Sequence, residues 1–203
     1  MNEEAGAAPG RAAWTDPGGD GRLLLVVPLP GLTRALPRLA QLECPAPFVP
    51  LLDPFLAEPD AGAISELTRL FADVVPFTTE LDDLSEFPGG PAYLSPRPSA
   101  PFRRLAGEVA HRFPEAGHHP TSFTDLPHVR VPRHRGETLE ELRTALSPWL
   151  PSATRADEAA LWWCPGRRQG TAADGDGEPG PSSDPASVGA RVVATFPFGT
   201  SAA

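Results

Sequence analysis

The sequence predicts an α+β fold in which two similar α/β lobes face a central cleft. Patterns typical of a strand, a helix, a strand, a helix and a strand follow one another twice along the 203 residues, with one further strand at the end. Two short segments share one design, because a proline precedes four strand-like residues in both Pro47–Leu51 and Pro127–Val131. Such a repeat implies two lobes about a pseudo-two-fold axis, and the cleft between two lobes is a natural ligand site.

The first round of the repeat begins and ends with a strand. Asp60 is expected to be the N-cap of its longer helix, because the apolar residues from Ile64 to Val74 share one helical face. Pro37 weakens the shorter helix. The expected elements are a strand over 23–27, a helix over 33–41, a strand over 48–52, the helix after Asp60 and a strand over 77–81.

The second round has the same order and a longer ending. Thr138 and Glu141 have the spacing of a capping box. Residues 170–189 contain no aromatic residue and one large aliphatic residue, so we expect a disordered hairpin insert there. The expected elements are a strand over 92–94, a helix over Phe102 to Phe113, a strand over 128–131, the helix after Thr138, and strands over 159–163 and 191–196.

Composition sets the expected domain boundaries and location. Residues 1–22 are rich in Ala, Gly and acidic residues and lack the features of a signal peptide, so we expect a disordered N-terminal segment. A single bilobal domain follows over 23–199, with a short tail over 200–203. The best apolar run, 23–29, is far shorter than the ~20 residues that cross a bilayer. These features predict a cytoplasmic monomer without membrane contact.

The charge of the chain is unevenly distributed. The net charge of -9 argues against DNA binding and against general binding to nucleic acid. Residues 53–86 hold nine acidic residues and one Arg, whereas 97–135 hold seven Arg and three acidic residues. The second half is therefore locally basic. The two cysteines, Cys44 and Cys164, are expected to be reduced, partly buried thiols.

Each of the two similar strands presents a pair of residues on one face. Because side chains alternate along a strand, His128 and Arg130 share one face, as do Phe48 and Pro50. A duplicated fold would bring these faces together. A histidine on both strands would predict an acid–base pair, but the first strand carries a phenylalanine.

Four segments, in this order and spacing, resemble the 2H phosphoesterase superfamily, in particular bacterial 2'-5' RNA ligase-like proteins. The closing segments 160–163 and 191–199 also look like the final hairpin of that family. The four segments are Leu25–Pro30, Phe48–Phe55, Phe87–Leu94 and Pro127–Val131.

The resemblance implies mainly antiparallel sheets and a His-x-Thr or His-x-Ser motif on each of two central strands. The two histidines of the family face one phosphate, one as general base and the other as general acid, while the hydroxyls bind phosphate oxygens. Cleaving a 2',3'-cyclic phosphate or a 2'-5' linkage needs one proton removed and another delivered, and imidazole titrates in the right range. Neither a metal nor a cofactor is required.

The sequence departs from this pattern at three of the four motif positions. Phe48 stands in place of the first histidine, Pro50 in place of the first hydroxyl residue and Arg130 in place of the second, so only His128 is kept. Losing a proton-transfer partner costs about 10²- to 10⁴-fold in rate. Asp53 is a poor substitute, because its odd offset from Phe48 predicts the opposite strand face.

Arg130 and the remaining histidines leave alternatives open. Arg130 either holds a phosphate in a forked contact or pairs with an acidic side chain or solvent. His118 or His119, in the loop before the second motif, is a possible replacement proton carrier. The five histidines between 111 and 134 match no metal-binding spacing, so no metal site is expected.

Three functions are compatible with these observations. The leading one is a catalytically impaired 2H phosphoesterase-like protein that binds a nucleotide or RNA-end phosphate through Arg130 and His128. The second is an active, atypical cyclic phosphodiesterase in which His128 works with a non-standard partner. The third is a protein-interaction module whose cleft is filled by Phe48 and its neighbours.

Overall fold

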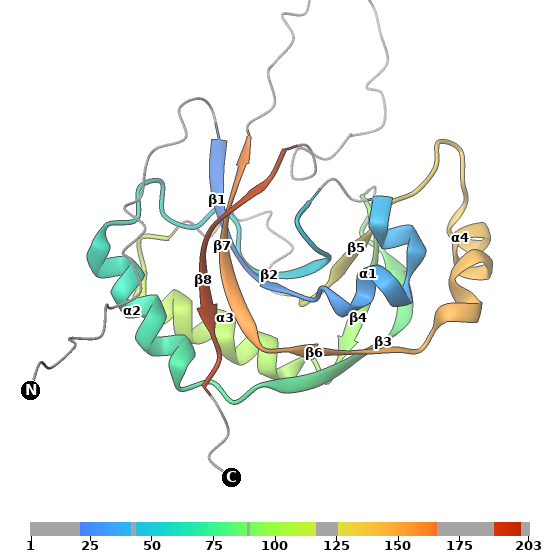
Figure 1. Ribbon diagram of the computed structural model, residues 1–203. Coiled ribbons are helices and arrows are strands. Elements are labelled where there is room, and N and C mark those ends of the chain that lie inside the picture. Colours follow the sequence, from blue (N-terminus) through green and yellow to red (C-terminus); the bar gives the residue numbers. More distant parts are fainter. Residues whose placement is uncertain (1–20, 42–43, 89, 117–125, 166–188, 200–203) are drawn as a thin grey trace, which may run out of the picture.

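The computed structural model of the protein describes residues 21–41, 44–88, 90–116, 126–165 and 189–199 (Figure 1). Within these residues the chain forms two four-stranded sheets, with the orders β2-β1-β7-β8 and β5-β4-β3-β6. Every strand pair in both sheets is antiparallel. The strands are β1 (Gly21–Pro28), β2 (Phe48–Leu52), β3 (Phe77–Glu86), β4 (Ala92–Arg97), β5 (Val129–Val131), β6 (Ser152–Ala156), β7 (Glu158–Pro165) and β8 (Arg191–Pro197).

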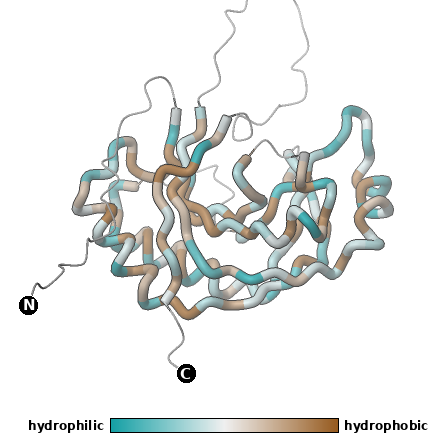
Figure 2. Tube along the Cα trace, in the orientation of Figure 1, coloured by the Kyte–Doolittle hydropathy of each residue, from teal (hydrophilic) through white to brown (hydrophobic). Residues whose placement is uncertain are grey.

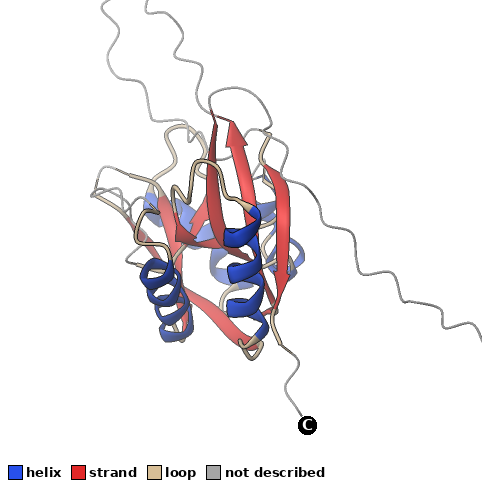
Figure 3. Cartoon of the chain, turned by 90° about the vertical axis from the view of Figure 1, so that its left-hand side faces the viewer, coloured by secondary structure: helices blue, strands red, loops and turns tan. Residues whose placement is uncertain are grey.

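Two helices, α2 and α4, begin at the predicted caps. The backbone N–H of Ala63 donates to Asp60 Oδ1 at 2.7 Å, and Thr138 and Glu141 form the complete capping box. The two longest helices, α2 and α3, lie side by side in front of the strands in Figure 3, and Arg112 of α3 is 3.2 Å from Glu66 of α2. The helices are α1 (Gly31–Ala35), α2 (Ala61–Ala72), α3 (Ala100–Arg112) and α4 (Leu139–Leu146), with 3-10 turns η1 (Pro37–Gln41) and η3 (Ser147–Trp149).

Each sheet contains strands from both rounds of the sequence pattern. β3 belongs to the first round, yet it pairs with β4 and β6 of the second. β7 follows β6 almost directly and pairs with β1, which returns the chain to the first sheet. The α+β fold with antiparallel sheets is confirmed. Each of its two sheets, however, combines strands from both halves of the sequence.

β3 and β4 run further than expected, to Glu86 and Arg97, and β5 begins one residue later, at Val129. Three further differences from the sequence-based expectation have a local cause. β1 begins at Gly21, inside the segment expected to be disordered, because Gly21 and Arg22 pair with β7. The helix expected over 33–41 is split at Leu36, because Pro37 disfavours helical geometry in the residue before it. β6 was not expected, since its buried residues Ser152, Thr154 and Ala156 are small or polar and give no hydrophobic alternation.

β1 lies at the centre of the first sheet and is buried on both faces, as its apolar run predicts (Figure 2). Its residues Leu23, Leu25 and Val27 join the main hydrophobic core. Leu24 and Val26 point the other way and join a smaller group, here named the Trp162 cluster. This cluster consists of Leu24, Val26, Ala46, Ala160, Trp162 and Cys164.

Some expectations fall on residues that the structure does not describe. These residues are 1–20, 170–188 and 200–203, which include most of the expected N-terminal segment, the insert and the tail. In the described part of the chain, no helix has both the length and the apolar character that a membrane span requires.

Candidate functional site

His128 lies immediately before β5, and only 5% of its surface is exposed. Its Nδ1 is 2.8 Å from the carbonyl oxygen of Leu126. Because a carbonyl oxygen can only accept, Nδ1 carries the proton and donates it, which leaves Nε2 as the acceptor of the ring. Burial lowers the pKa of His128 to about 4; the hydrogen bond to Leu126 opposes this shift and the charge of Arg130 adds to it. The imidazole is therefore neutral near pH 7.

Two aromatic rings form a wall against this imidazole. Phe87 and Tyr93 are stacked with their ring centroids 4.2 Å apart. Both meet His128 edge to face, at centroid distances of 5.0 Å and 5.9 Å. Sequence reasoning did not assign either ring to the site. The pairing of Tyr93 with Arg130 across β4 and β5 is what places the tyrosine on the same face of the sheet.

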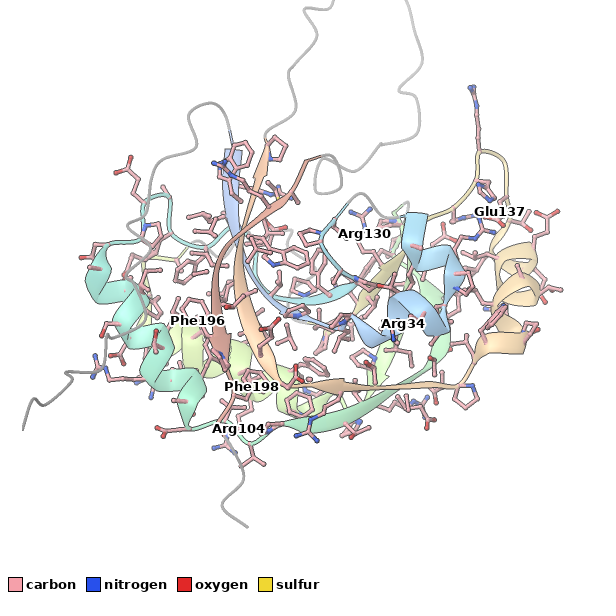
Figure 4. All side chains as sticks on the ribbon, in the orientation of Figure 1. Arg34, Arg104, Arg130, Glu137, Phe196 and Phe198 are labelled. Carbon is pink, nitrogen blue, oxygen red and sulfur yellow. The ribbon has the colours of Figure 1, made fainter. Side chains whose placement is uncertain are left out.

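Arg130 is half-buried on β5, at the place where β5 approaches β2 (Figure 4). Burial lowers the pKa of its guanidinium to about 10; the positive charge of Arg22 lowers it further, and the negative charge of Asp53 acts in the opposite direction. A group with this pKa is still cationic near pH 7. Arg130 therefore keeps a positive charge in a partly desolvated position, close to charged groups of the first sheet.

Asp53 lies on the face that carries Phe48 and Pro50, and the expectation that it points to the opposite face was wrong. The reason is a β-bulge in β2. Val26 pairs with Pro50 but Leu25 pairs with Leu52, so one additional residue interrupts the alternation. After the bulge, odd-numbered residues of this segment therefore lie on the face that carries even-numbered residues before it. Arg22 Nε, on the same face of β1, lies 3.1 Å from Asp53 Oδ1.

Phe48 and Pro50 contribute no hydrogen-bonding side chain to this face. Phe48 is half-buried, and its ring meets that of Trp162 edge to face at a centroid distance of 4.8 Å. It packs against the Trp162 cluster. Pro50 is half-buried and paired with Val26. A hydrocarbon surface thus occupies the positions where the resemblance places the first histidine and hydroxyl residue.

The other residues singled out in the sequence lie apart from this group or outside the described chain. His111 is exposed near the end of α3, and His134 is exposed after β5. His118 and His119 belong to residues 117–125, which the structure does not describe, so their role as replacement proton carriers stays a prediction. Within the described residues, no three His, Cys, Asp or Glu side chains are grouped as metal ligands would be.

Both cysteines are free thiols beside the same cluster. Cys164 belongs to the Trp162 cluster and Cys44 packs against it. The Cys44 thiol donates to the carbonyl oxygen of Ala46 at 3.0 Å. Burial raises the pKa of each thiol to about 11. Both groups are therefore neutral near pH 7 and are poor nucleophiles.

The family model of the 2'-5' RNA ligase superfamily matches residues 33–168, which is more than half of the chain. The chain belongs to this superfamily. The match includes β2, which begins with Phe48, and His128 with the strand β5 that follows it. Among curated proteins, a sequence search finds no significant match to this superfamily member.

Several solved structures share the fold of this chain. E. coli LigT in its apo form is similar with a TM-score of 0.53 and 15% identity, covering 88% of this chain and 98% of that one. A protein of Thermus thermophilus has a TM-score of 0.51 and 17% identity, covering 87% and 97%. A structure described as a phosphoesterase has a TM-score of 0.52 and 15% identity, covering 89% and 99%. At these identities the likeness is one of fold.

Proposed function

We propose that this 2'-5' RNA ligase superfamily member binds a nucleotide or an RNA end by its phosphate, through Arg130 and His128, and lacks two-histidine catalysis. The observation that carries the proposal is the half-buried cation of Arg130 beside the neutral imidazole of His128. A guanidinium suits a phosphate because it donates two parallel hydrogen bonds, and partial burial strengthens such bonds.

Ligands of a fold relative agree with this choice. E. coli LigT has been solved with 3'-AMP and with phosphate, and these structures match this chain with TM-scores of 0.50 and 0.51 at 16% identity. Both ligands are phosphate compounds. We propose only this chemical class of ligand, phosphate compounds, for the present protein.

The groups of the site that can give or accept a proton support the proposal of impaired catalysis. A neutral His128 with a pKa of about 4 carries no proton on Nε2 at pH 7 that it could deliver to a leaving group, and it is a weak base. A bound phosphate would raise this pKa through its negative charge. A second proton carrier is still needed, and we infer that Phe48 occupies its position on β2.

Binding is tested by titrating the protein with 2',3'-cyclic nucleotides, short 2'-5' oligonucleotides and inorganic phosphate in a calorimeter. We expect Arg130→Ala to weaken binding about 10- to 100-fold, as the loss of a charge-assisted hydrogen bond predicts. Arg104→Ala, on the exposed surface of α3, is the matched control and should bind like wild type. No affinity of the wild type even at millimolar ligand contradicts the proposal and favours an interaction module with a filled cleft.

Impairment is tested by restoring the motif. The double variant Phe48→His, Pro50→Thr should cleave 2',3'-cyclic phosphates about 10²- to 10⁴-fold faster than wild type, because it regains a proton carrier and a hydroxyl. Adding His128→Ala should abolish the gain. A wild-type rate that is well above the uncatalysed rate and equal to that of the double variant shows that catalysis is not impaired.

The position of Asp53 favours a second candidate function, an active atypical phosphodiesterase. The bulge in β2 brings this carboxylate to the face of the missing histidine, where a proton-transfer group is needed. Turnover of 2',3'-cyclic phosphates by wild type, His128→Ala and Asp53→Asn separates the two candidates. Equal rates for all three exclude catalysis by these residues.

A further inference from the structure

Two cations, Arg22 and Arg130, and the carboxylate of Asp53 interact where we propose that the phosphate binds. Arg22 Nε is 3.1 Å from Asp53 Oδ1. The charges of both groups shift the pKa of Arg130, which Arg22 lowers and Asp53 raises. Arg22 is on β1, Asp53 follows β2 and Arg130 is on β5, so the group joins the two sheets where β2 approaches β5.

Among the described residues near this trio, His128 and the two thiols are neutral near pH 7, and Tyr93 lies opposite Arg130 on β4. Burial keeps His128 unprotonated, and the thiols of Cys44 and Cys164 keep their protons. Within the part of the chain that the structure describes, the charges that act on Arg130 most are then those of Arg22 and Asp53. One negative charge is already present to balance two positive ones.

We propose that Asp53 is an internal counter-ion that competes with the ligand and balances only one of the two arginines, so that the site prefers terminal phosphate monoesters over cyclic or internal phosphodiesters. A diester is a monoanion, so exchanging it for Asp53 beside the arginines replaces one negative charge by another. A monoester is a dianion above its second pKa of about 6, so the same exchange adds a negative charge between two cations. This inference rests on the proposed phosphate binding at Arg130.

The first test uses the wild-type protein and one nucleoside in two forms, the 3'-monophosphate and the 2',3'-cyclic monophosphate. At about pH 7.5 we expect the monoester to bind at least about tenfold more tightly, and at about pH 5.5, where it is largely a monoanion, the preference should disappear. In the ligand-free protein His128, with a pKa of about 4, stays neutral over this range. Equal affinities at the higher pH overturn the inference.

The second test removes the counter-ion. Asp53→Asn should raise the affinity for both ligands without narrowing the preference for the monoester, because the removed negative charge opposes a dianion at least as strongly as a monoanion. The matched control is Asp82→Asn, because Asp82 forms a comparable ion pair of 3.0 Å with Arg97, away from Arg130. We expect the control to leave both affinities unchanged.

The outcomes separate this inference from the proposed function. If Asp53→Asn binds both ligands as the wild type does, or more weakly, the counter-ion role is wrong while phosphate binding stands. If neither protein binds any phosphate compound, the proposed function itself fails.

Discussion

At the scale of single residues, the site is governed by how burial changes charge. The His128 imidazole is buried as a neutral ring, and its Nδ1–H donates a hydrogen bond to the carbonyl oxygen of Leu126. Protonating it would place a charge in a desolvated position close to the cation of Arg130. The residue is thus suited to accept a hydrogen bond from a ligand at neutral pH, and it resists carrying a positive charge.

This environment predicts a pH-dependent stability. The folded pKa of His128 is about 4 and the ordinary value is 6.5, so the unfolded chain binds this proton more tightly. The contribution is fully present above about pH 6.5 and falls by about 3 kcal/mol as the pH decreases to about 4. The free energy of unfolding, measured with urea between these pH values, should fall more steeply with decreasing pH for wild type than for His128→Gln. The exposed His134→Gln is the control, and equal slopes in all three proteins contradict the prediction.

At the scale of secondary-structure elements, one extra residue in β2 decides which groups meet. Without the bulge between Pro50 and Leu52, strict alternation would direct Asp53 away from Arg22 and Arg130. The same face would then carry Phe48, Pro50 and Leu52, which have no charged group. The charged part of the candidate site therefore depends on a local irregularity of one strand.

The helix caps allow a direct test at this scale. Asp60→Ala and Thr138→Ala should each lower the free energy of unfolding by about 1 kcal/mol, because each leaves a backbone N–H without its cap. Ser99 is the N-cap of α3 but makes no side-chain capping bond, so Ser99→Ala should cost less than about 0.5 kcal/mol. Chemical unfolding measures all three, and equal losses would show that capping is not the cause.

At the scale of the whole molecule, a largely buried ion pair ties distant parts of the chain together. Arg38 Nη2 of η1 lies 2.7 Å from Glu137 Oε1 in the segment after β5, and their side chains are only 13% and 12% exposed. Arg133 donates to the backbone carbonyl of Glu137 and lies 2.9 Å from Glu86. These contacts hold the segment that follows His128 and Arg130 against the first half of the chain.

A double-mutant cycle tests this connection. Arg38→Ala and Glu137→Ala should each destabilise the fold strongly, because each leaves a partner charge in a desolvated position. The double variant should lose less than the sum, with a coupling of about 1–3 kcal/mol. The exposed pair Arg143 and Glu140 is the matched control, with an expected coupling below about 0.5 kcal/mol. Equal coupling energies in both cycles would show that burial does not strengthen the ion pair between Arg38 and Glu137.

Local patterns in the sequence by themselves determined most of the elements, both helix caps, the α+β class and the resemblance to the superfamily. These properties depend on residues near one another in the chain, as at Asp60 and Ala63. Only the tertiary structure decided the strand β6, the aromatic wall of Phe87 and Tyr93, and the meeting of Asp53, Arg22 and Arg130. The physical reason is that periodicity assigns faces within a single strand, whereas register, bulges and burial depend on pairing with strands far away in the sequence.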